Sequence, residues 1–311
     1  MLSPHGCRVF AEAGWQEVLD DPSVVRLCLG VRRRWAGAAR ETEDFFLQPG
    51  GPGRIAARAR LDGMMLGLAR RAGAGARIGR VAGAYRHGDR IEVAVATSSG
   101  AERLSGDLVI DASGRRASVA RRLGARRVTE ARQAAWRLPG TRRTSPGGGA
   151  WIDISGCPGD WEYELDGHDG EPERVRICRS RPPGAGANAL DASSAWLDRA
   201  AGEGWVAVGD AAVSCDPIAG QGLGLAVASA AAVAGAILAD RVAPQARFQE
   251  YSSRLAATRR YYSKARKKLL QGAASPGAHP RPGGPGTDGA GNHPQPALSC
   301  GAGVSGRGDG A

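Results

Sequence analysis

The chain has 311 residues, of which 42% are hydrophobic, and its formal net charge is +11. This length is enough for one large domain or two ordinary ones with a sizeable core. Only three of the 42 basic residues are Lys, and the many Arg residues are spread along the chain. They do not alternate with aromatic residues as in a surface on which bases stack, so the composition argues against nucleic-acid binding.

The cysteines also exclude some classes of protein. The six cysteines form no C-x-x-C pair, and no His lies at metal-ligand spacing from them, which predicts reduced thiols in a cytoplasmic protein and no metal site. The first ten residues lack a basic segment followed by an apolar core, so no signal peptide is expected. The apolar stretch 223–239 is shorter than the ~20 residues that a membrane span needs, and we expect a buried helix there.

The first half of the chain alternates helical and extended patterns. A short helix is expected near 11–19 and a strand over 24–31. Residues 59–72 have the apolar spacing of an amphipathic helix that ends at Gly73, which is a suitable C-cap. Two alternating runs, 77–85 and 90–97, flank a turn and predict a β-hairpin.

The second half begins with a short apolar strand over 108–110. Residues 139–190 are expected to be rich in loops, with two strands around 156–159. Another buried strand is expected over 206–208, before a loop and the apolar helix. A second helix over 245–271 carries an aromatic stripe; its basic residues leave open a membrane-surface or partner-binding role.

We expect four segments along the chain. They are a partial cofactor-binding domain (1–136), a β-rich substrate-side segment (137–198), a cofactor motif with C-terminal helices (199–271) and a disordered Gly/Pro-rich tail (272–311).

The strongest functional signal lies between 205 and 222. A strand ends at Gly209, where the backbone can turn close to a ligand, and Asp210 offers a carboxylate to hydroxyl donors. Pro217 stiffens the next turn. Gly220, Gln221 and Gly222 then present backbone N–H groups at the start of a long helix, where the helix dipole favours negative charge. This arrangement suits a polyol joined to an electron-rich ring, although a glycine-rich joint without a ligand would show the same pattern.

This string resembles the second FAD fingerprint of flavoprotein hydroxylases, flavin-dependent halogenases and geranylgeranyl-reductase-like enzymes. The resemblance implies FAD as the cofactor, with Asp210 on the ribityl chain and the Gly209 backbone near the pyrophosphate. It also implies that the loop from Pro217 to Gly222 lies against the isoalloxazine ring.

Two further segments support this resemblance. Residues 106–115 resemble the strand that re-enters the FAD sheet of these families. Arg58 matches an Arg that contacts the cofactor in them, and a solvated Arg at a helix start remains an equal alternative.

Shorter strings resemble one branch of these flavoproteins. Residues 192–205 and the Tyr261-Tyr262 pair look like flavoproteins that mature quinone-cofactor amine or amino-acid oxidases, which are related to tryptophan halogenases. The implied substrate is an aromatic small molecule or a protein tryptophan, and the implied partner is a flavin reductase. Every Lys follows residue 263, so the catalytic Lys of halogenases is not matched and the catalytic residues stay unknown.

The chain departs from these families at one important point. They begin with a strand that leads into a Gly-x-Gly-x-x-Gly motif, which holds the FAD pyrophosphate, and no expected strand in this sequence is followed by that motif. A downstream start codon or a decaying gene would explain the difference. We therefore expect an α/β fold: a partial, N-terminally truncated, glutathione-reductase-like Rossmann-type FAD domain with a β-rich substrate-side insertion.

The expected function is that of an FAD-dependent oxidoreductase of the aromatic monooxygenase or halogenase-like type. The alternative is a non-catalytic remnant or binding protein that retains the flavoprotein shell.

Overall fold

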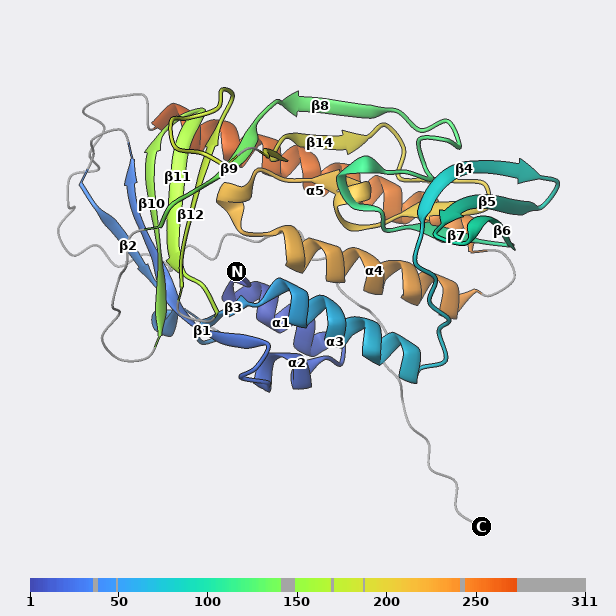
Figure 1. Ribbon diagram of the computed structural model, residues 1–311, viewed down its shortest axis with the longest axis horizontal. Helices are drawn as coiled ribbons and strands as arrows, with labels where there is room; N and C mark the ends of the chain where they lie inside the picture. Colours follow the sequence, from blue (N-terminus) through green and yellow to red (C-terminus); the bar gives the residue numbers. More distant parts are fainter. Residues whose placement is uncertain are drawn as a thin grey trace, which may run out of the picture.

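The computed structural model describes residues 1–35, 39–48, 50–140, 149–168, 171–186, 188–240 and 244–272. Figure 1 shows an elongated molecule with a large sheet at one end and smaller sheets, packed with helices, at the other. The helices are α1 (Pro4–Glu12), α2 (Gln16–Asp20), α3 (Arg58–Arg71), α4 (Gly222–Ala239) and α5 (Gln245–Gly272). The 3-10 turns are η1 (Phe45–Leu47), η2 (Gly114–Arg116), η3 (Gly209–Ala211) and η4 (Pro217–Ala219).

The large sheet has eight strands in the order β13-β9-β12-β11-β10-β1-β2, and β3 also pairs with β1. Its strands are β1 (Val25–Trp35), β2 (Glu41–Asp44), β3 (Gly53–Ala56), β9 (Ala134–Leu138), β10 (Ala150–Cys157), β11 (Asp160–Asp166), β12 (Pro172–Cys178) and β13 (Leu190–Asp191). Strand β1 runs parallel to β10, so the sheet joins an early segment of the chain to the segment expected on the substrate side.

The segment 139–190 contains more strand than expected. The predicted pair around 156–159 is confirmed as β10 and β11, but β12 was missed. Three of its seven residues are charged, and its two arginines are paired with acidic residues across the sheet. Arg174 forms an ion pair with Glu162 at 2.8 Å, and Arg176 forms one with Asp160 at 2.6 Å.

A second, three-stranded sheet contains the two apolar strands predicted near 108–110 and 206–208. Its order is β15-β16-β7, from β7 (Val109–Asp111), β15 (Ala201–Gly202) and β16 (Trp205–Ala207). Strands β7 and β16 are parallel, with Ile110 opposite Val206, and the N–H of Val208 donates to the carbonyl oxygen of Asp111 at 3.0 Å. This confirms that the two predicted apolar strands share one sheet and end side by side. Among the described strands, β7 pairs only with β16.

Two antiparallel sheets complete the fold. The predicted hairpin is confirmed as β4 (Arg80–His87) and β5 (Arg90–Thr97), and it gains a third strand, β6 (Gly100–Gly106), that the sequence analysis did not predict. The other sheet is β17-β14-β8, from β8 (Arg127–Ala131), β14 (Ser194–Leu197) and β17 (Val213–Ser214).

The single helix expected near 11–19 is wrong. Helix α1 starts earlier because the hydroxyl of Ser3 accepts a hydrogen bond from the N–H of Gly6 and Pro4 occupies the first turn. Gly14 has φ +83°, which ends this helix before α2 begins. The amphipathic helix over 59–72 is confirmed as α3.

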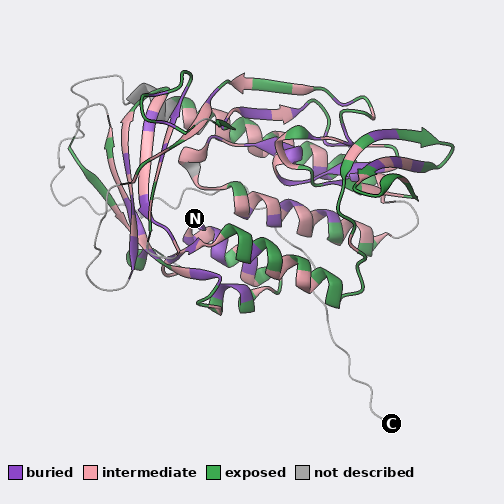
Figure 2. Cartoon of the chain, viewed as in Figure 1, coloured by how far each residue is buried: buried purple, intermediate pink, exposed green. Residues whose placement is uncertain are grey.

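Helix α4 is confirmed as a helix, but its expected burial is wrong in part. Gly224, Val227, Ser229 and Val233 are buried, whereas most other residues are half-buried and Leu238 is 67% exposed. Figure 2 shows this mixed colouring along α4. By length and composition alone α4 could cross a membrane, with 22% of it buried. In the fold it packs against α1, η3 and α5.

Helix α5 confirms the predicted aromatic stripe. Phe248, Tyr251 and Leu255 are buried, and the hydroxyl of Tyr251 donates to the carbonyl oxygen of Ala207 in β16. The helix therefore packs against the parallel strands. The expected disordered tail, 272–311, lies outside the described residues except for Gly272, which ends α5.

Candidate functional site

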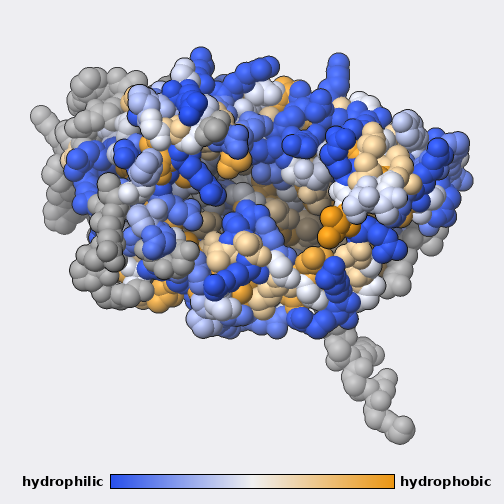
Figure 3. Space-filling model, in the orientation of Figure 1, coloured by the Kyte–Doolittle hydropathy of each residue, from blue (hydrophilic) through white to orange (hydrophobic). Residues whose placement is uncertain are grey.

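A cavity of about 1250 Å³ lies where the parallel strands end. One wall comes from the loops after β7 and β16 and from the start of α4, and the opposite wall is one face of the eight-stranded sheet. The surface is hollowed over the middle of the molecule (Figure 3). Ligand pockets usually measure about 300–1,000 Å³, so this cavity is large enough for a ligand.

All the residues predicted to bind a cofactor line this one cavity. They are Arg58, Gly209, Asp210, Pro217, Gly220, Gln221 and Gly222. They come from the start of α3, from η3, and from the segment that joins η4 to α4. The fold therefore brings together residues that are far apart in the sequence.

Gly209 allows the sharp turn at the end of β16. Its φ is +56°, which favours glycine, and an added Cβ would lie 3.2 Å from Cβ of Ala226 in α4. Its N–H donates to the hydroxyl of Ser229 at 2.8 Å. The turn is thus held tightly against α4 and places Asp210 at the cavity wall.

Asp210 is joined to a residue that the sequence analysis did not select. Nε of Arg115 lies 3.4 Å from Oδ2 of Asp210, and Arg115 also lines the cavity. Burial raises the pKa of Asp210, and the charge of Arg115 opposes this shift. The only sequence signal for Arg115 was its place in the loop after β7.

Asp111, at the end of β7, has a different role. Its carboxylate is 1% exposed and accepts hydrogen bonds from the N–H groups of Ser113, Val119 and Ala120 at 2.8–2.9 Å. These bonds fix the loop that carries Arg115, so Asp111 shapes the cavity wall without facing a ligand.

The amino end of α4 is open to the cavity. Gly220 has φ +59°, and Gln221, the N-cap, makes no side-chain hydrogen bond to the helix. The first N–H groups of a helix have no partner within it. The N–H groups of Gly222 and Leu223, which line the cavity, are therefore available to an acceptor, and the helix dipole favours a negative one.

Arg58 occupies the first position of α3 and reaches both cavity and solvent. Its side chain is 64% exposed and forms an i,i+4 ion pair with Asp62 at 3.2 Å. The two sequence alternatives for Arg58, cofactor contact or solvated helix start, both agree with this position.

The opposite wall is mostly apolar. It includes Val31, Phe45, Ile152, Ile154, Trp161, Tyr163 and Leu165, which come from β1, η1, β10 and β11. Four charged residues of the same sheet also line it: Arg33, Glu43, Arg137 and Glu173. Burial raises the pKa of Tyr163. The sequence predicted the two strands β10 and β11, but not that they form a wall of this cavity. Among the described residues, no group of three or more His, Cys, Asp or Glu is arranged to hold a metal ion.

Known proteins resemble this chain in fold, although not closely in sequence. No family model matches it, and no curated protein matches it. Solved structures do match. The flavin-dependent brominase Bmp2 is 16% identical, with a TM-score of 0.68 over 88% of this chain and 82% of that one.

Two other solved structures extend the comparison. The myxobacterial chondrochloren halogenase CndH is 22% identical, with a TM-score of 0.67 over 87% of this chain and 71% of that one. The peptidyl tryptophan dihydroxylase QhpG is 18% identical, with a TM-score of 0.59 over 84% and 65%. These likenesses confirm the predicted α/β fold and its similarity to the folds of FAD-dependent halogenases and monooxygenases.

Proposed function

We propose that this protein is an FAD-dependent oxidoreductase of the aromatic monooxygenase or halogenase-like type. The observation that carries the proposal is the meeting of the seven predicted residues at one cavity, at the carboxyl ends of the parallel strands β7 and β16. Open α/β sheets bind ligands at these ends. The similar solved structures, which include a flavin-dependent brominase, support the same function.

The residues that line the cavity suit FAD in their chemistry. The carboxylate of Asp210 can accept hydrogen bonds from ribityl hydroxyls, and the uncapped start of α4 offers N–H groups to an electron-rich ring. When bound, FAD supplies the redox chemistry that activates oxygen and oxidises an aromatic ring. The protein would bind and orient the cofactor, and the apolar side chains of the opposite wall would contact the substrate.

The proposed substrate is an aromatic small molecule or a protein tryptophan. The apolar wall that contains Ile152, Ile154 and Trp161 provides contact area for an aromatic ring. QhpG, one of the similar structures, acts on a peptidyl tryptophan.

The proposal includes a flavin reductase as the electron source and a cytoplasmic location. Five cysteines in the described part of the chain are free, as suits a reducing compartment.

A direct test supplies the full chain with chemically reduced FAD, oxygen and a panel of aromatic compounds, including a Trp-containing peptide. We expect mass spectrometry to find an oxygenated product that is absent with Asp210→Ala. Lack of product from every substrate, although FAD binds, would count against an oxygenase.

One observation favours a second function, that of a binding protein that retains the shell of the fold. No strand of the described chain is followed by a Gly-x-Gly-x-x-Gly motif, which residues 1–272 do not contain. Such a protein would bind an aromatic ligand in the cavity without turnover, and the product assay separates the two functions.

A further inference from the structure

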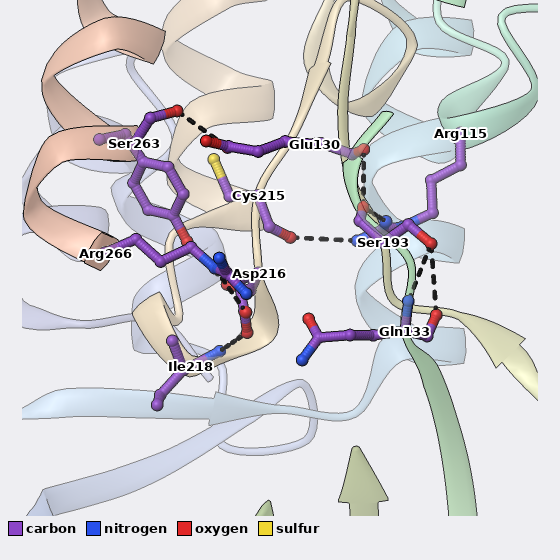
Figure 4. Close-up of polar contacts among 11 residues, drawn as sticks. Arg115, Glu130, Gln133, Ser193, Cys215, Asp216, Ile218, Ser263 and Arg266 are labelled. Atoms are coloured by element: carbon purple, nitrogen blue, oxygen red, sulfur yellow. Dashed lines mark hydrogen bonds and ion pairs between the residues drawn. The ribbon is translucent and has the colours of Figure 1, made fainter. Parts of the chain in front are cut away.

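A buried polar cluster lies behind the loop at residues 215–220, which we call the Asp216 loop. Asp216 is 2% exposed, and its Oδ2 accepts a hydrogen bond from Nε of Arg266 in α5 at 2.9 Å. The side chain of Arg266 is 11% exposed, so the pair is shielded from water. Figure 4 shows Arg266 reaching from α5 to the carboxylate of Asp216.

Other hydrogen bonds hold the same loop. Oδ1 of Asp216 accepts from the N–H of Ile218 at 3.2 Å, and its carbonyl oxygen accepts from the hydroxyl of Tyr262 at 3.2 Å. The carbonyl oxygen of Cys215 accepts from Arg115 at 3.2 Å. The start of the loop is therefore held from α5 on one side and from the loop after β7 on the other.

The first half of α5 is held by separate contacts. Phe248 and Leu255 are buried in the core, Tyr251 donates to the carbonyl oxygen of Ala207, and Gln245 donates to that of Gly202. Removal of Arg266 should leave these contacts in place. The C-terminal part of α5 can therefore hold the Asp216 loop, while the N-terminal part of the helix makes the contacts that stabilise the fold.

The Asp216 loop leads directly into the amino end of α4. Gly220 turns the chain with φ +59°, and Gly222 begins the helix. The direction of the first N–H groups of α4 therefore depends on the shape of this loop. Without Arg266, a buried carboxylate would lose its charged partner, which is costly. The carboxylate would then turn toward water in the cavity, which Asp216 also lines.

We propose that Arg266 and Tyr262 are positioning residues that hold the Asp216 loop so that the amino end of α4 faces the cavity. The inference rests on the proposed function, because the part of the cavity wall that α5 holds in place is the part proposed to bind FAD. It predicts that α5 affects ligand binding without touching the ligand.

The test is hydrogen exchange of the full chain without ligand, comparing wild type with Arg266→Met. We expect the amides of Ile218 and Gly220 to exchange at least tenfold faster in the variant, while the β4–β5 hairpin is unchanged. Arg266→Lys, which keeps the charge, should restore most of the protection. The matched control is Arg254→Met, because Arg254 forms an exposed i,i+4 pair with Glu250 on the same helix.

A second measurement uses FAD at a concentration near the wild-type dissociation constant. We expect quenching of its fluorescence to fall at least threefold in Arg266→Met and to be unchanged in Arg254→Met. If Arg266→Met does not fold, Tyr262→Phe must show the same local change in exchange to a smaller extent.

Three results would overturn the inference. They are unchanged exchange in a folded variant, an equal increase over the whole chain, and unchanged exchange in Tyr262→Phe where that variant is needed. If the wild type binds no FAD but exchange changes locally, the proposed function fails and the positioning role stands.

Discussion

Nε of Arg115 lies 3.4 Å from Oδ2 of Asp210, so the loop after β7 is joined to the loop after β16 at the wall of the cavity. The same guanidinium donates to the carbonyl oxygens of Ser193 and Cys215, at 2.5 and 3.2 Å. One side chain therefore connects three other segments of the chain beside the carboxylate proposed to bind the cofactor.

Replacement of Arg115 by Met should destabilise the protein. The two carbonyl oxygens lose a charged donor, and the partly exposed ion pair adds little, so we expect the free energy of unfolding to fall by about 1.5–3 kcal/mol. Urea unfolding followed by tryptophan fluorescence measures this change. Arg116→Met, at an exposed neighbouring position, should change the free energy by less than about 0.5 kcal/mol. Equal effects of the two substitutions would contradict the role of Arg115.

The pH dependence of stability should reveal Asp210. Burial raises the pKa of its carboxyl group above the value of about 4 in the unfolded chain. The folded state then binds the proton more tightly, so this group makes the protein less stable as pH rises from the ordinary pKa through the raised one. Asp210→Asn removes this contribution. The melting temperature of the variant relative to wild type should therefore increase with pH from about 4 upward. A difference that is flat or decreases would show that the pKa of Asp210 is not raised.

Gly209 should not tolerate a side chain. Its positive φ and the contact with Ala226 predict that Gly209→Ala lowers the free energy of unfolding by about 1–3 kcal/mol. Gly63 in α3 is a matched control, because it is helical, exposed and has open space around it. Gly63→Ala should stabilise the protein by about 0.5–1 kcal/mol. Thermal unfolding of both variants checks this contrast, which fails if Gly209→Ala is neutral.

The sequence predicted the parts of the site that depend on local pattern. Strands β7 and β16 are short apolar runs. Gly209 and Asp210 mark the turn after β16, and Gly220 marks the turn before α4, so their residue types reflect the backbone shape and chemistry there. The hairpin β4–β5 and helix α3 were predictable for the same reason, since spacing alone defines them.

The remaining features depend on pairing between distant segments. Strand β1 pairs with β10, which lies more than 100 residues later in the chain, and no local sequence pattern indicates this pairing or its register. The opposite wall of the cavity could therefore not be predicted from the sequence. Arg115 is one of many Arg residues, and its role follows only from where Ser193 and Cys215 are placed. The partial exposure of α4 could not be predicted either, because an apolar sequence indicates a buried helix and does not show which neighbours cover it.

The proposed function depends above all on whether the purified full chain binds FAD. Residues 1–272 contain no Gly-x-Gly-x-x-Gly motif, and we infer that two or three hydrogen bonds to a charged group are missing, each worth ~1.5–3 kcal/mol. We therefore expect binding weaker by about 10² to 10⁶-fold than in a complete site, so little FAD should survive desalting. A fluorescence titration should still show saturable binding that Asp210→Ala abolishes and that Asp89→Ala, in the exposed β4–β5 turn, leaves unchanged. No saturable binding by the wild type, or binding that Asp210→Ala leaves unchanged, would show that this cavity does not bind FAD through Asp210.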